Sequence, residues 1–474
     1  MNSKKEPSLL QVLGLGTAIL LVAGNMIGSG VFKKITPMSA ELMDGSLILW
    51  AWVAAGLITM LGAFSFASLA TTTKEAGGQF QYFKNVFGGF FGFIYGWSFF
   101  TVISTASIAS IAYVFAQSLG NLAHVPPILE AYTSYSIGGV LFPFQNASVK
   151  LIAITALFLL TLFNIRGVEG GGWLSNIVTS AKILGILLLI VLGLSYSGHE
   201  AHPGVSPVHM INRDQTGELL RISAFFTAML GAFWAYDGWV NITNMASEFK
   251  NPTKNIPRAI IIGTALTMFL YVLVNYAYLQ VLTPSDFARL NAQEGSIAAV
   301  EVAGIVMGPI GITVISILIM VSTFGATQAS TMSAARVYYQ MSKEGYFFKP
   351  FSHVHKRFRT PHISLYGQMI WASLLILSGT FDQLTDMLIF AAFIFYALGA
   401  VAVIRLKMQG KLTLTFGYPI VPFLFLLCCL VIVVNAIYTR PLESLTGLGL
   451  ITLGVPFYLY FRSRNQFIPL KEES

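Results

Sequence analysis

The sequence predicts an all-α membrane protein with twelve transmembrane helices, of which the first and the sixth are interrupted. Hydrophobic residues make up 55% of the 474 residues and charged residues only 10%. The mean hydropathy of +0.71 is higher than that of a soluble domain of this length. About twelve apolar runs are long enough to cross a bilayer, which takes roughly 20 residues, and two of them contain helix-breaking residues.

Short polar segments separate these apolar runs. The runs fall near residues 9–32, 46–70, 87–119, 149–164, 173–195, 221–247, 259–282, 308–335, 362–380, 384–405, 418–438 and 443–461. The third run and the run that begins near residue 308 are longer than a bilayer requires, so we expect both helices to tilt.

Lysine and arginine are distributed unevenly over the connecting segments. With the N-terminus inside the cell, the predicted cytoplasmic segments hold 20 of the 28 cationic residues and the outer segments hold seven, while Lys182 lies inside a span. Cytoplasmic loops are the ones enriched in Lys and Arg. The bias therefore predicts a multi-pass protein of the cell membrane with both termini in the cytoplasm, and it explains the formal charge of +8 without nucleic acid binding.

The first run is interrupted by residues 24–30, Gly-Asn-Met-Ile-Gly-Ser-Gly. Each glycine costs a helix interior about 1 kcal/mol relative to alanine, so we expect the helix to break here. At membrane depth, freed peptide groups are tolerated only where they face protein or a wet cavity. One interpretation is a site where a half-helix beginning near Gly30 points N–H groups at an anion and the preceding carbonyls attract a cation. The other is close helix packing over small residues.

The sixth run contains a second candidate break in residues 231–239. Asp237 and Gly238 lie there at mid-membrane, flanked by aromatic residues. Because Asp favours turns over helix interiors, we expect the helix to unwind at this point.

Five spans separate the two breaks, and an odd number of spans inverts the second unit relative to the first. We therefore predict a 5+5 inverted-repeat fold with two extra C-terminal helices. The predicted organisation is a cytoplasmic N-terminus (1–8), a first repeat (9–195), a second repeat (221–407), two further spans (418–461) and a cytoplasmic C-terminus (462–474).

Several short motifs occur in order on the expected spans. They are residues 24–32 (GNMIGSGVF), 75–78 (EAGG) with Tyr82, 234–239 (WAYDGW), 248–252 (EFKNP), 256–260 (IPRAI), and 322–325 (STFG) through Arg336. Together they resemble the amino acid-polyamine-organocation (APC) superfamily, most closely the bacterial relatives of its L-amino acid transporter branch. The resemblance extends over nearly the whole chain and implies the LeuT-like form of the inverted-repeat fold.

The resemblance implies that the two breaks hold one amino acid. The N–H groups of Ser29 and Gly30 would bind its carboxylate, and the carbonyls of Met26, Trp234, Ala235 and Asp237 its ammonium. The implied substrate-binding set is Met26, Ile27, Gly28, Ser29, Gly30, Trp234, Ala235, Tyr236 and Asp237. Trp234 occupies the position of the family's gate, an aromatic residue that closes over the substrate from outside. Many relatives have Phe at this position, and the animal relatives have Gly in place of Asp237.

Lys182 lies near the middle of the run 173–195. A lysine there costs roughly 2.5–3.5 kcal/mol on insertion scales, and its side chain cannot easily reach the interface. One interpretation is a structural cation that satisfies helix-end carbonyls. The resemblance implies another, because in sodium-independent relatives a lysine replaces the sodium ion that bridges spans 1, 5 and 8. Its ammonium would then contact the carbonyls of Ala23 and Gly24 and the hydroxyl of Ser322.

Other polar residues in the runs are weaker candidates. Thr101, Ser104 and Ser107 in the third run and Tyr396 in the tenth could face a pocket or could form hydrogen bonds between helices. Outside the runs, Glu75 and residues 248–258 could form cytoplasmic gating contacts or a solvated loop.

The sequence shows no signature of an enzyme or of a cofactor site. It has no Walker motif, no nucleophile–base pair and no metal-ligand spacing. The only cysteines, Cys428 and Cys429, are adjacent within an apolar run, where no disulfide between them is plausible. We therefore expect a protein that is not an enzyme and has neither a metal nor another cofactor.

The combined pattern predicts sodium-independent transport of neutral L-amino acids by alternating access, with exchange (antiport) as the expected mode. A proton-coupled symporter of the same fold is the alternative. From a different class comes an amino acid sensor that binds without transporting. A channel would need a continuous polar pore lining, whereas the polar residues here gather at two breaks.

The expected partners are a small amino acid substrate and the lipid bilayer, with no nucleic acid. The animal relatives join a glycoprotein through a cysteine in the outer loop between the third and fourth spans. Residues 119–149 contain no cysteine. We therefore expect no disulfide-linked heavy subunit.

Overall fold

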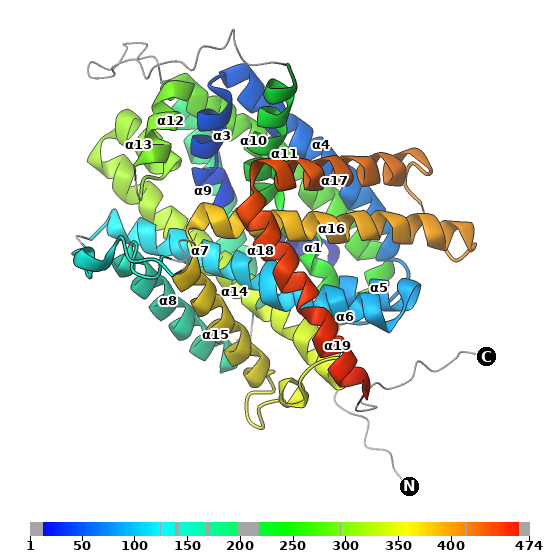
Figure 1. The fold of residues 1–474 in the computed structure, drawn as a ribbon. Coiled ribbons are helices and arrows are strands. Elements are labelled where there is room, and N and C mark those ends of the chain that lie inside the picture. The colour runs from blue at the N-terminus through cyan, green and yellow to red at the C-terminus, as the bar shows by residue number, and fades with distance from the viewer. Residues whose placement is uncertain are drawn as a thin grey trace.

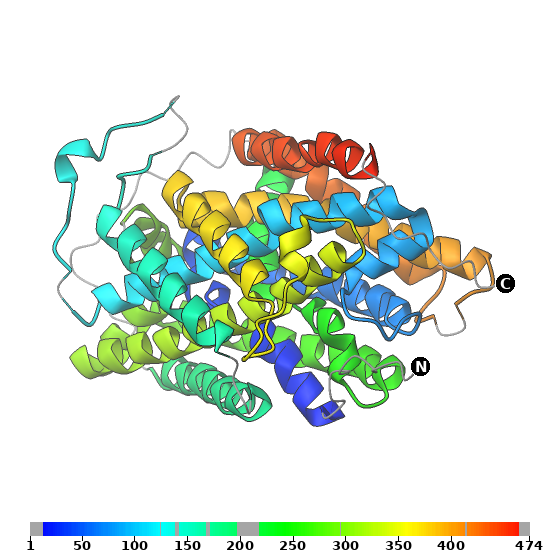
Figure 2. The same ribbon diagram turned by 90° about the horizontal axis from the view of Figure 1, so that it is seen from below.

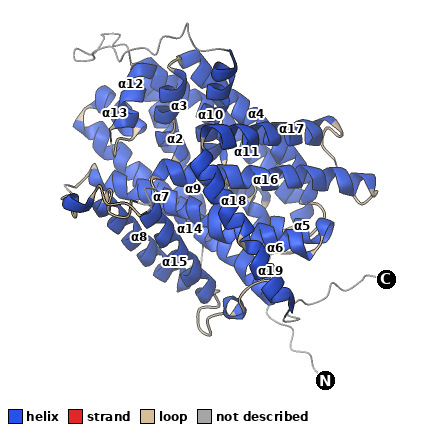
Figure 3. Cartoon of the chain, in the orientation of Figure 1, coloured by secondary structure: helices blue, strands red, loops and turns tan. Residues whose placement is uncertain are grey.

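The computed structural model describes residues 13–123, 125–137, 142–166, 171–196, 218–293, 295–412 and 415–463. Within these ranges the chain is helical and forms no strand, apart from one isolated bridge between Leu13 and Phe249 (Figure 3). Nine of the described helical segments are long and apolar enough to cross a membrane. The prediction of an all-α, multi-pass membrane protein is confirmed, and the count of twelve helices stays a prediction. The predicted N-terminal segment 1–8 and most of 462–474 lie outside the described residues.

The described helices follow one another along the chain. They are α1 (Leu15–Met26), α2 (Gly30–Lys33), α3 (Ile35–Leu42), α4 (Gly45–Leu69), α5 (Gln79–Phe87), α6 (Gly89–Ser98), the π-helical η1 (Phe99–Ile103), α7 (Ser104–Gly120), η2 (Glu130–Tyr132), α8 (Ala147–Ile165), α9 (Gly171–Ser195), α10 (Glu218–Tyr236), η4 (Asn241–Glu248), α11 (Pro252–Val281), α12 (Pro284–Ala292), α13 (Ala298–Met307), α14 (Pro309–Lys343), η5 (Lys349–Ser352), α15 (His362–Ser378), α16 (Phe381–Met408), α17 (Ile420–Thr439), α18 (Pro441–Thr452) and α19 (Gly454–Ser463).

The long helices coincide with the predicted apolar runs. The third run forms one continuous helical segment of 32 residues from α6 through α7, and α14 has 35 residues. Both therefore exceed the roughly 20 residues that a bilayer needs. The shorter helices α5, α12 and α13 were not predicted, because they lie in connecting segments that are too short or too polar to stand out as spans.

Local signals set the starts of several helices. The carboxylate of Asp44 accepts hydrogen bonds from the N–H groups of Ser46 and Leu47 and so caps α4. A capping box formed by Thr380 and Gln383 begins α16. Each cap satisfies N–H groups that the first turn of a helix leaves unpaired.

The helices pack so that the interrupted segments lie within the bundle. Helix α1 packs against α9, α11 and α14, while α10 packs against α3, α4 and α16. Two pairs of helices, α16 with α17 and α8 with α15, run side by side in Figure 1. Seen from below in Figure 2, α18 and α19 (red) lie along one edge of the molecule. This arrangement leaves α17 to α19 outside the contacts that surround α1.

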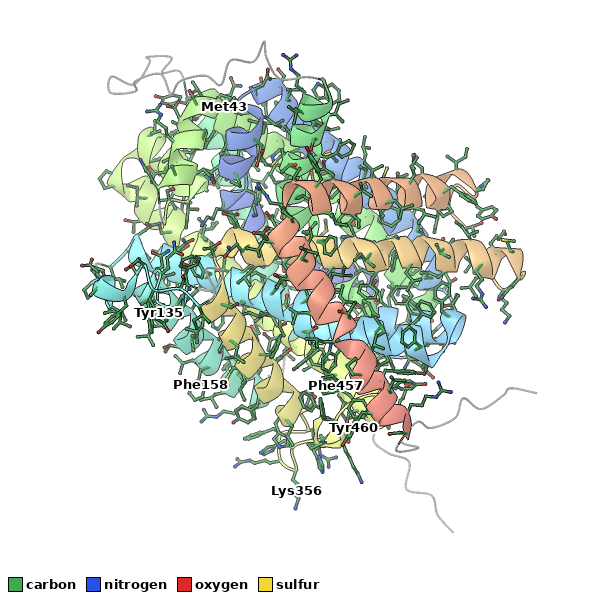
Figure 4. All side chains as sticks on the ribbon, in the orientation of Figure 1. Met43, Tyr135, Phe158, Lys356, Phe457 and Tyr460 are labelled. Carbon is green, nitrogen blue, oxygen red and sulfur yellow. The ribbon has the colours of Figure 1, made fainter. Side chains whose placement is uncertain are left out.

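The outer surface of the bundle is apolar. Phe158 of α8 is 44% exposed and Tyr460 of α19 is 45% exposed, and both lie at the periphery in Figure 4. Side chains of this kind are expected where lipid replaces water. Met43, at the end of α3, and Lys356, after η5, lie at opposite ends of the molecule in the same view, as expected for one outer and one inner connection.

Candidate functional site

The first apolar run breaks where its glycines predicted. Helix α1 ends at Met26 and α2 begins at Gly30, and the N–H group of Gly28 donates to the carbonyl of Met26 across the gap, at 2.8 Å. Among the described residues, no hydrogen bond is found for the N–H groups of Ser29 and Gly30. These two donors point out of the first turn of α2, where a helix can bind an anion.

The sixth run breaks as well. Helix α10 ends at Tyr236, and a turn leads into the 3₁₀ helix η4, which begins at Asn241. Gly238 in this turn has φ +103°, a conformation that residues with a Cβ atom rarely adopt. The glycine therefore permits the turn, and Asp237 beside it is placed at the break rather than in a regular helix.

The two breaks touch each other. A Cβ atom added to Gly30 would lie 2.5 Å from the Cα atom of Ala235, and one added to Gly238 would lie 2.7 Å from the carbonyl oxygen of Asn25. No side chain fits at either contact. The glycines of both runs are therefore required for this close approach, which brings the ends of four short helical segments to one place.

A small cavity lies between the breaks. Its walls come from both breaks, from α7, from η4 and from α14. The lining residues are Asn25, Met26, Gly28, Ser29, Gly30, Ser107, Ile111, Trp234, Asp237, Gly238, Asn241 and Ser330. Six of the nine residues of the predicted substrate-binding set line this cavity, namely Met26, Gly28, Ser29, Gly30, Trp234 and Asp237.

The remaining three residues of the set do not line the cavity. The side chain of Tyr236 points away and donates to the carbonyl of Trp52, at 3.2 Å. Ala235 packs against Gly30 at the contact between the breaks. The carbonyl of Ile27 instead accepts a hydrogen bond from Lys182, at 2.9 Å.

Trp234 covers one side of the cavity and is itself held in place. Its ring meets the edge of Phe381, with centroids 6.2 Å apart. The ammonium groups of Lys33 and Lys34 lie 4.7 and 4.6 Å from the centroid of the same Phe381 ring, a cation–π geometry. Lys34 also forms an ion pair with Asp382, at 2.6 Å. Phe381 and Asp382 at the start of α16 therefore connect Trp234 to the segment that follows the first break.

Lys182 of α9 reaches the first break from the side. Its ammonium donates to the carbonyls of Gly24, at 3.0 Å, and Ile27, at 2.9 Å. The resemblance implied Ala23 in the position that Ile27 takes, but the carbonyl of Ala23 accepts the N–H group of Ile27, at 2.7 Å. Ser322 donates to the carbonyl of Gly28, at 3.3 Å. Lysine and serine thus satisfy neighbouring carbonyls of one break.

Two tyrosines bond to the breaks. The hydroxyl of Tyr396 donates to the carboxylate of Asp237, at 2.6 Å, so this residue of the tenth run does face the site. The hydroxyl of Tyr271 donates to the carbonyl of Met26, at 2.9 Å. With the N–H of Gly28, this bond occupies both lone pairs of that carbonyl. Sequence reasoning missed Tyr271, because a tyrosine in an apolar run carries no signal of its partner.

Ion pairs join neighbouring helices at the end of the molecule that holds η4. Arg336 of α14 pairs with Glu248 of η4, at 2.8 Å, and Lys84 of α5 pairs with Glu344 of α14, at 2.6 Å. The main chain of Leu13 bonds to both Glu248 and Lys250. Ion pairs therefore join neighbouring helices on both sides of the site. Glu75 is exposed and is not part of these contacts.

The amino acid sequence matches a known family over nearly its whole length. The family is described as amino acid permease, and its pattern matches residues 13–458. The chain belongs to the amino acid permease family. This permease is therefore a membrane transporter of the APC superfamily and not an enzyme, as predicted.

The permease is also similar to individual curated proteins. It is 30% identical to the serine/threonine exchanger SteT of Bacillus subtilis (strain 168), over 89% of each chain. It is 29% identical to the human b(0,+)-type amino acid transporter 1, over 96% of this chain and 89% of that one. It is 27% identical to the human large neutral amino acids transporter small subunit 2, over 95% of this chain and 80% of that one. These relatives support amino acid transport.

The described part of the permease shows no group of three or more His, Cys, Asp or Glu residues that could hold a metal ion. Lys182 is a cationic side chain that bonds directly to the first break. The groups around the cavity between the breaks are peptide groups, hydroxyls, side-chain amides and one carboxylate.

Proposed function

We propose that this permease exchanges neutral L-amino acids across the cell membrane without sodium. The observation that carries the proposal is the contact between the two breaks. It brings the N–H groups of Ser29 and Gly30, which have no partner within the described part of the chain, to the same cavity as the peptide groups beside Trp234 and Asp237. An amino acid zwitterion has one charge of each sign at a short, fixed spacing. Free N–H groups and helix-end carbonyls complement those two charges.

In the proposed binding mode, Ser29 and Gly30 hold the carboxylate, and the carbonyls of Trp234, Ala235 and Asp237 hold the ammonium. The carbonyl of Met26 joins them once it gives up its bond to Tyr271, because both of its lone pairs are otherwise occupied. All these groups belong to the main chain, so they recognise what amino acids share. Discrimination among amino acids then depends on the side chains that line the cavity.

Lys182 supports the sodium-independent form of the proposal. Its ammonium bonds to two carbonyls of the first break, and carbonyl oxygens are also the ligands that a hard cation would take. The ammonium group at this position can supply the positive charge that a sodium ion would supply. Transport would then not depend on a sodium gradient.

Exchange by alternating access would give both breaks a role in gating. We propose that residues 9–195 and 221–407 form inverted repeats whose first helices tilt around the site, with 418–461 outside this symmetry, both termini cytoplasmic and Trp234 as the outer gate. A bound amino acid that bridges the breaks would favour the closed form. The name of the Bacillus relative, an exchanger, supports exchange as the mode. A single chain is proposed to suffice, with no disulfide-linked subunit.

The function can be tested with the purified full chain in liposomes. Vesicles preloaded with a labelled neutral amino acid should lose it faster when unlabelled amino acid is added outside, and sodium should not change the rate. If external amino acid fails to speed efflux while a pH gradient alone drives accumulation, exchange is wrong. Specific binding without any transport would instead indicate a sensor.

The counterflow assay also tests Lys182. We expect Lys182→Ala to slow exchange by about tenfold or more, because each carbonyl left unpaired costs on the order of 1–3 kcal/mol at a segment that must move. Lys150→Ala is the matched control. Lys150 is equally buried and donates to the carbonyls of Phe142 and Leu377, away from the breaks. Equal exchange rates in wild type and Lys182→Ala would assign Lys182 a structural role only.

The proton-coupled alternative draws support from Asp237. Its carboxylate accepts the hydroxyl of Tyr396, and no ion pair with a cation is found for it among the described residues. A carboxylate at membrane depth without a counter-charge is costly, and a proton is one way to neutralise it. Accumulation driven by an imposed pH gradient in vesicles that contain no internal amino acid would favour this alternative.

A further inference from the structure

The connection between α14 and α15 carries an unbalanced positive charge. All four cations of residues 345–381 are exposed, and this stretch contains no Asp or Glu. The four are Lys349, Lys356, Arg357 and Arg359. The acid that precedes them, Glu344, pairs with Lys84 of α5, at 2.6 Å. Within the described residues no ion pair is found for any of the four cations. Their charge is therefore available to a negatively charged partner outside the chain.

Three of these cations belong to one hydrogen-bonded turn. The basic turn, as we call residues 355–360, contains Lys356, Arg357 and Arg359. The N–H group of His355 donates to the carbonyl of Thr360, at 2.8 Å, and the N–H group of Arg359 donates to the carbonyl of His355, at 2.9 Å. The Nδ1 atom of His355 accepts the N–H groups of Arg357 and Phe358, at 3.2 and 3.1 Å. These main-chain groups are paired within the turn, so the turn presents its three charged side chains to a partner.

The basic turn lies against the end of α8. The hydroxyl of Thr360 donates to the carbonyl of Ile165, the last residue of α8, at 2.7 Å. The next residue, Arg166, is exposed and adds a further cation beside the turn. Helix α8 is long and apolar enough to cross a membrane, and α15 begins at His362, directly after the turn. Figure 4 shows Lys356 beyond the ends of both helices. The cations are therefore placed where these helices reach the surface of a bilayer.

An apolar surface of α8 and α15 adjoins these cations. Leu159 and Phe163 of α8 are exposed, and so are Tyr366 and Ile370 of α15. The members of each pair are four residues apart, so they lie on the same side of their helix. The two helices pack side by side (Figure 1). Together they combine an apolar surface with a group of cations at its end, as a phospholipid combines acyl chains with a charged headgroup.

We propose that the basic turn, Arg166 and the exposed sides of α8 and α15 form a binding site for an anionic phospholipid. The guanidinium groups hold the headgroup phosphate, because their planar fork matches two phosphate oxygens at once. The acyl chains lie along the apolar side chains of the two helices. Clusters of Lys and Arg next to a membrane helix attract anionic lipids. A soluble acidic protein would leave the apolar surface unused, so the lipid fits better. This inference does not depend on the proposed function.

Lipid binding can be measured on the purified full chain in detergent micelles. Phosphatidylglycerol and phosphatidylcholine with the same acyl chains are added separately, and the bound lipid is counted by native mass spectrometry. We expect phosphatidylglycerol to bind about tenfold or more tightly, and equal binding would overturn the proposal. Inorganic phosphate and polyglutamate, compared with sodium chloride at the same ionic strength, should not displace it further. Displacement by either would assign the basic turn to a soluble anion instead.

Matched charge substitutions test whether the cations of the basic turn act as a group. The test variant combines Lys356→Gln, Arg357→Gln and Arg359→Gln. We expect it to bind phosphatidylglycerol about tenfold or more weakly and phosphatidylcholine as the wild type does. The control variant removes three exposed cations from two other connections and combines Lys250→Gln, Lys254→Gln and Lys411→Gln. Equal weakening in both variants would show attraction by net charge alone and would overturn the assigned site.

A substitution without change of charge tests the arrangement of the turn. Thr360→Val keeps the shape of the side chain and removes the hydrogen bond to α8. We expect the preference for phosphatidylglycerol over phosphatidylcholine to fall severalfold, because the cations are no longer held beside Arg166. Thr446→Val is the control, since its hydroxyl donates to the carbonyl of Leu442 within α18, at 2.7 Å. An unchanged preference in Thr360→Val would contradict a site built by the turn and α8.

Discussion

Two glycines at the residue scale set the distance between the breaks. Gly30 faces the main chain of Ala235, and Gly238 faces the main chain of Asn25. In both cases the obstacle to a side chain is backbone, which cannot rotate away as a flexible side chain can. Only Gly238 also needs its special conformation, with φ +103°. A substitution at Gly30 is therefore opposed by the contact with Ala235 alone, whereas one at Gly238 is opposed both by the contact with Asn25 and by the backbone conformation.

We expect Gly30→Val to abolish uptake without preventing membrane insertion. The added Cβ would lie 2.5 Å from the Cα atom of Ala235, so the two breaks would have to separate and the cavity would lose its form. Uptake into liposomes and the yield of monodisperse protein measure the two effects. Gly16→Val is the control, since nothing lies within 4 Å of a Cβ atom at Gly16. Normal uptake by Gly30→Val would contradict the assigned contact.

At the residue scale the sequence predicted which residues form the breaks and, through the resemblance, the contact of Lys182 with the carbonyl of Gly24, but not their other partners. The pattern of glycines located residues 24–30, and Asp237 with Gly238 located the second break. Tyr271 bonds to Met26 from 245 residues away, and Ile27 rather than Ala23 receives Lys182. Local composition reports how the backbone bends, whereas these partners depend on how distant helices pack.

At the scale of elements, α2 and α3 are tied to α16 and to the start of α18. Lys34 donates to the carboxylate of Asp382, at 2.6 Å, and to the hydroxyl of Thr385, at 2.8 Å. Arg440, which precedes α18, pairs with Glu41 of α3, at 2.6 Å. In the proposed alternating access, the segment after the first break has to move for the site to open on this side. We therefore propose that these contacts hinder that movement.

We expect Asp382→Asn to open the site to the outside more often, because it removes the carboxylate that holds Lys34. A cysteine at Ser29, which is 1% exposed, reports opening through its rate of reaction with a thiol reagent that does not cross membranes. The two native cysteines would be replaced by alanine in this background. We expect the rate of labelling from outside to rise severalfold.

Asp286→Asn is the matched control for this experiment. The carboxylate of Asp286 pairs with Arg289 within the same helix, α12, so its loss releases no tie between elements. Its labelling rate should equal that of the parent. Equal rates for Asp382→Asn and the parent would show that the ion pair with Lys34 does not hold the site closed.

At the scale of the whole molecule, the basic connections gather at one end of the bundle. Residues 349–359 contain four exposed Lys and Arg residues. One of them is Lys356, which lies at the end opposite Met43 in Figure 4. Loops enriched in Lys and Arg stay on the cytoplasmic side of membranes. The distribution of charge thus predicts which end faces the cell interior.

We expect a single cysteine at Lys356 to react with an impermeant thiol reagent only from the cytoplasmic side. A single cysteine at Glu130, an exposed residue of η2, should react only from the outside. Labelling of intact cells and of inverted membrane vesicles measures both sites, and each serves as the control for the other. Reaction of Lys356→Cys in intact cells would reverse the proposed orientation.

The sequence by itself determined the class of the protein, the places where two helices break and the expected sidedness. Each of these follows from composition or from residues that are neighbours in the chain. Only the tertiary structure decided that the breaks meet, that Lys34 pairs with a carboxylate 348 residues away, and that serines of α7 and α14 share one cavity. The physical reason is that local patterns govern backbone conformation and burial, whereas contacts between distant residues depend on how the helices pack in three dimensions.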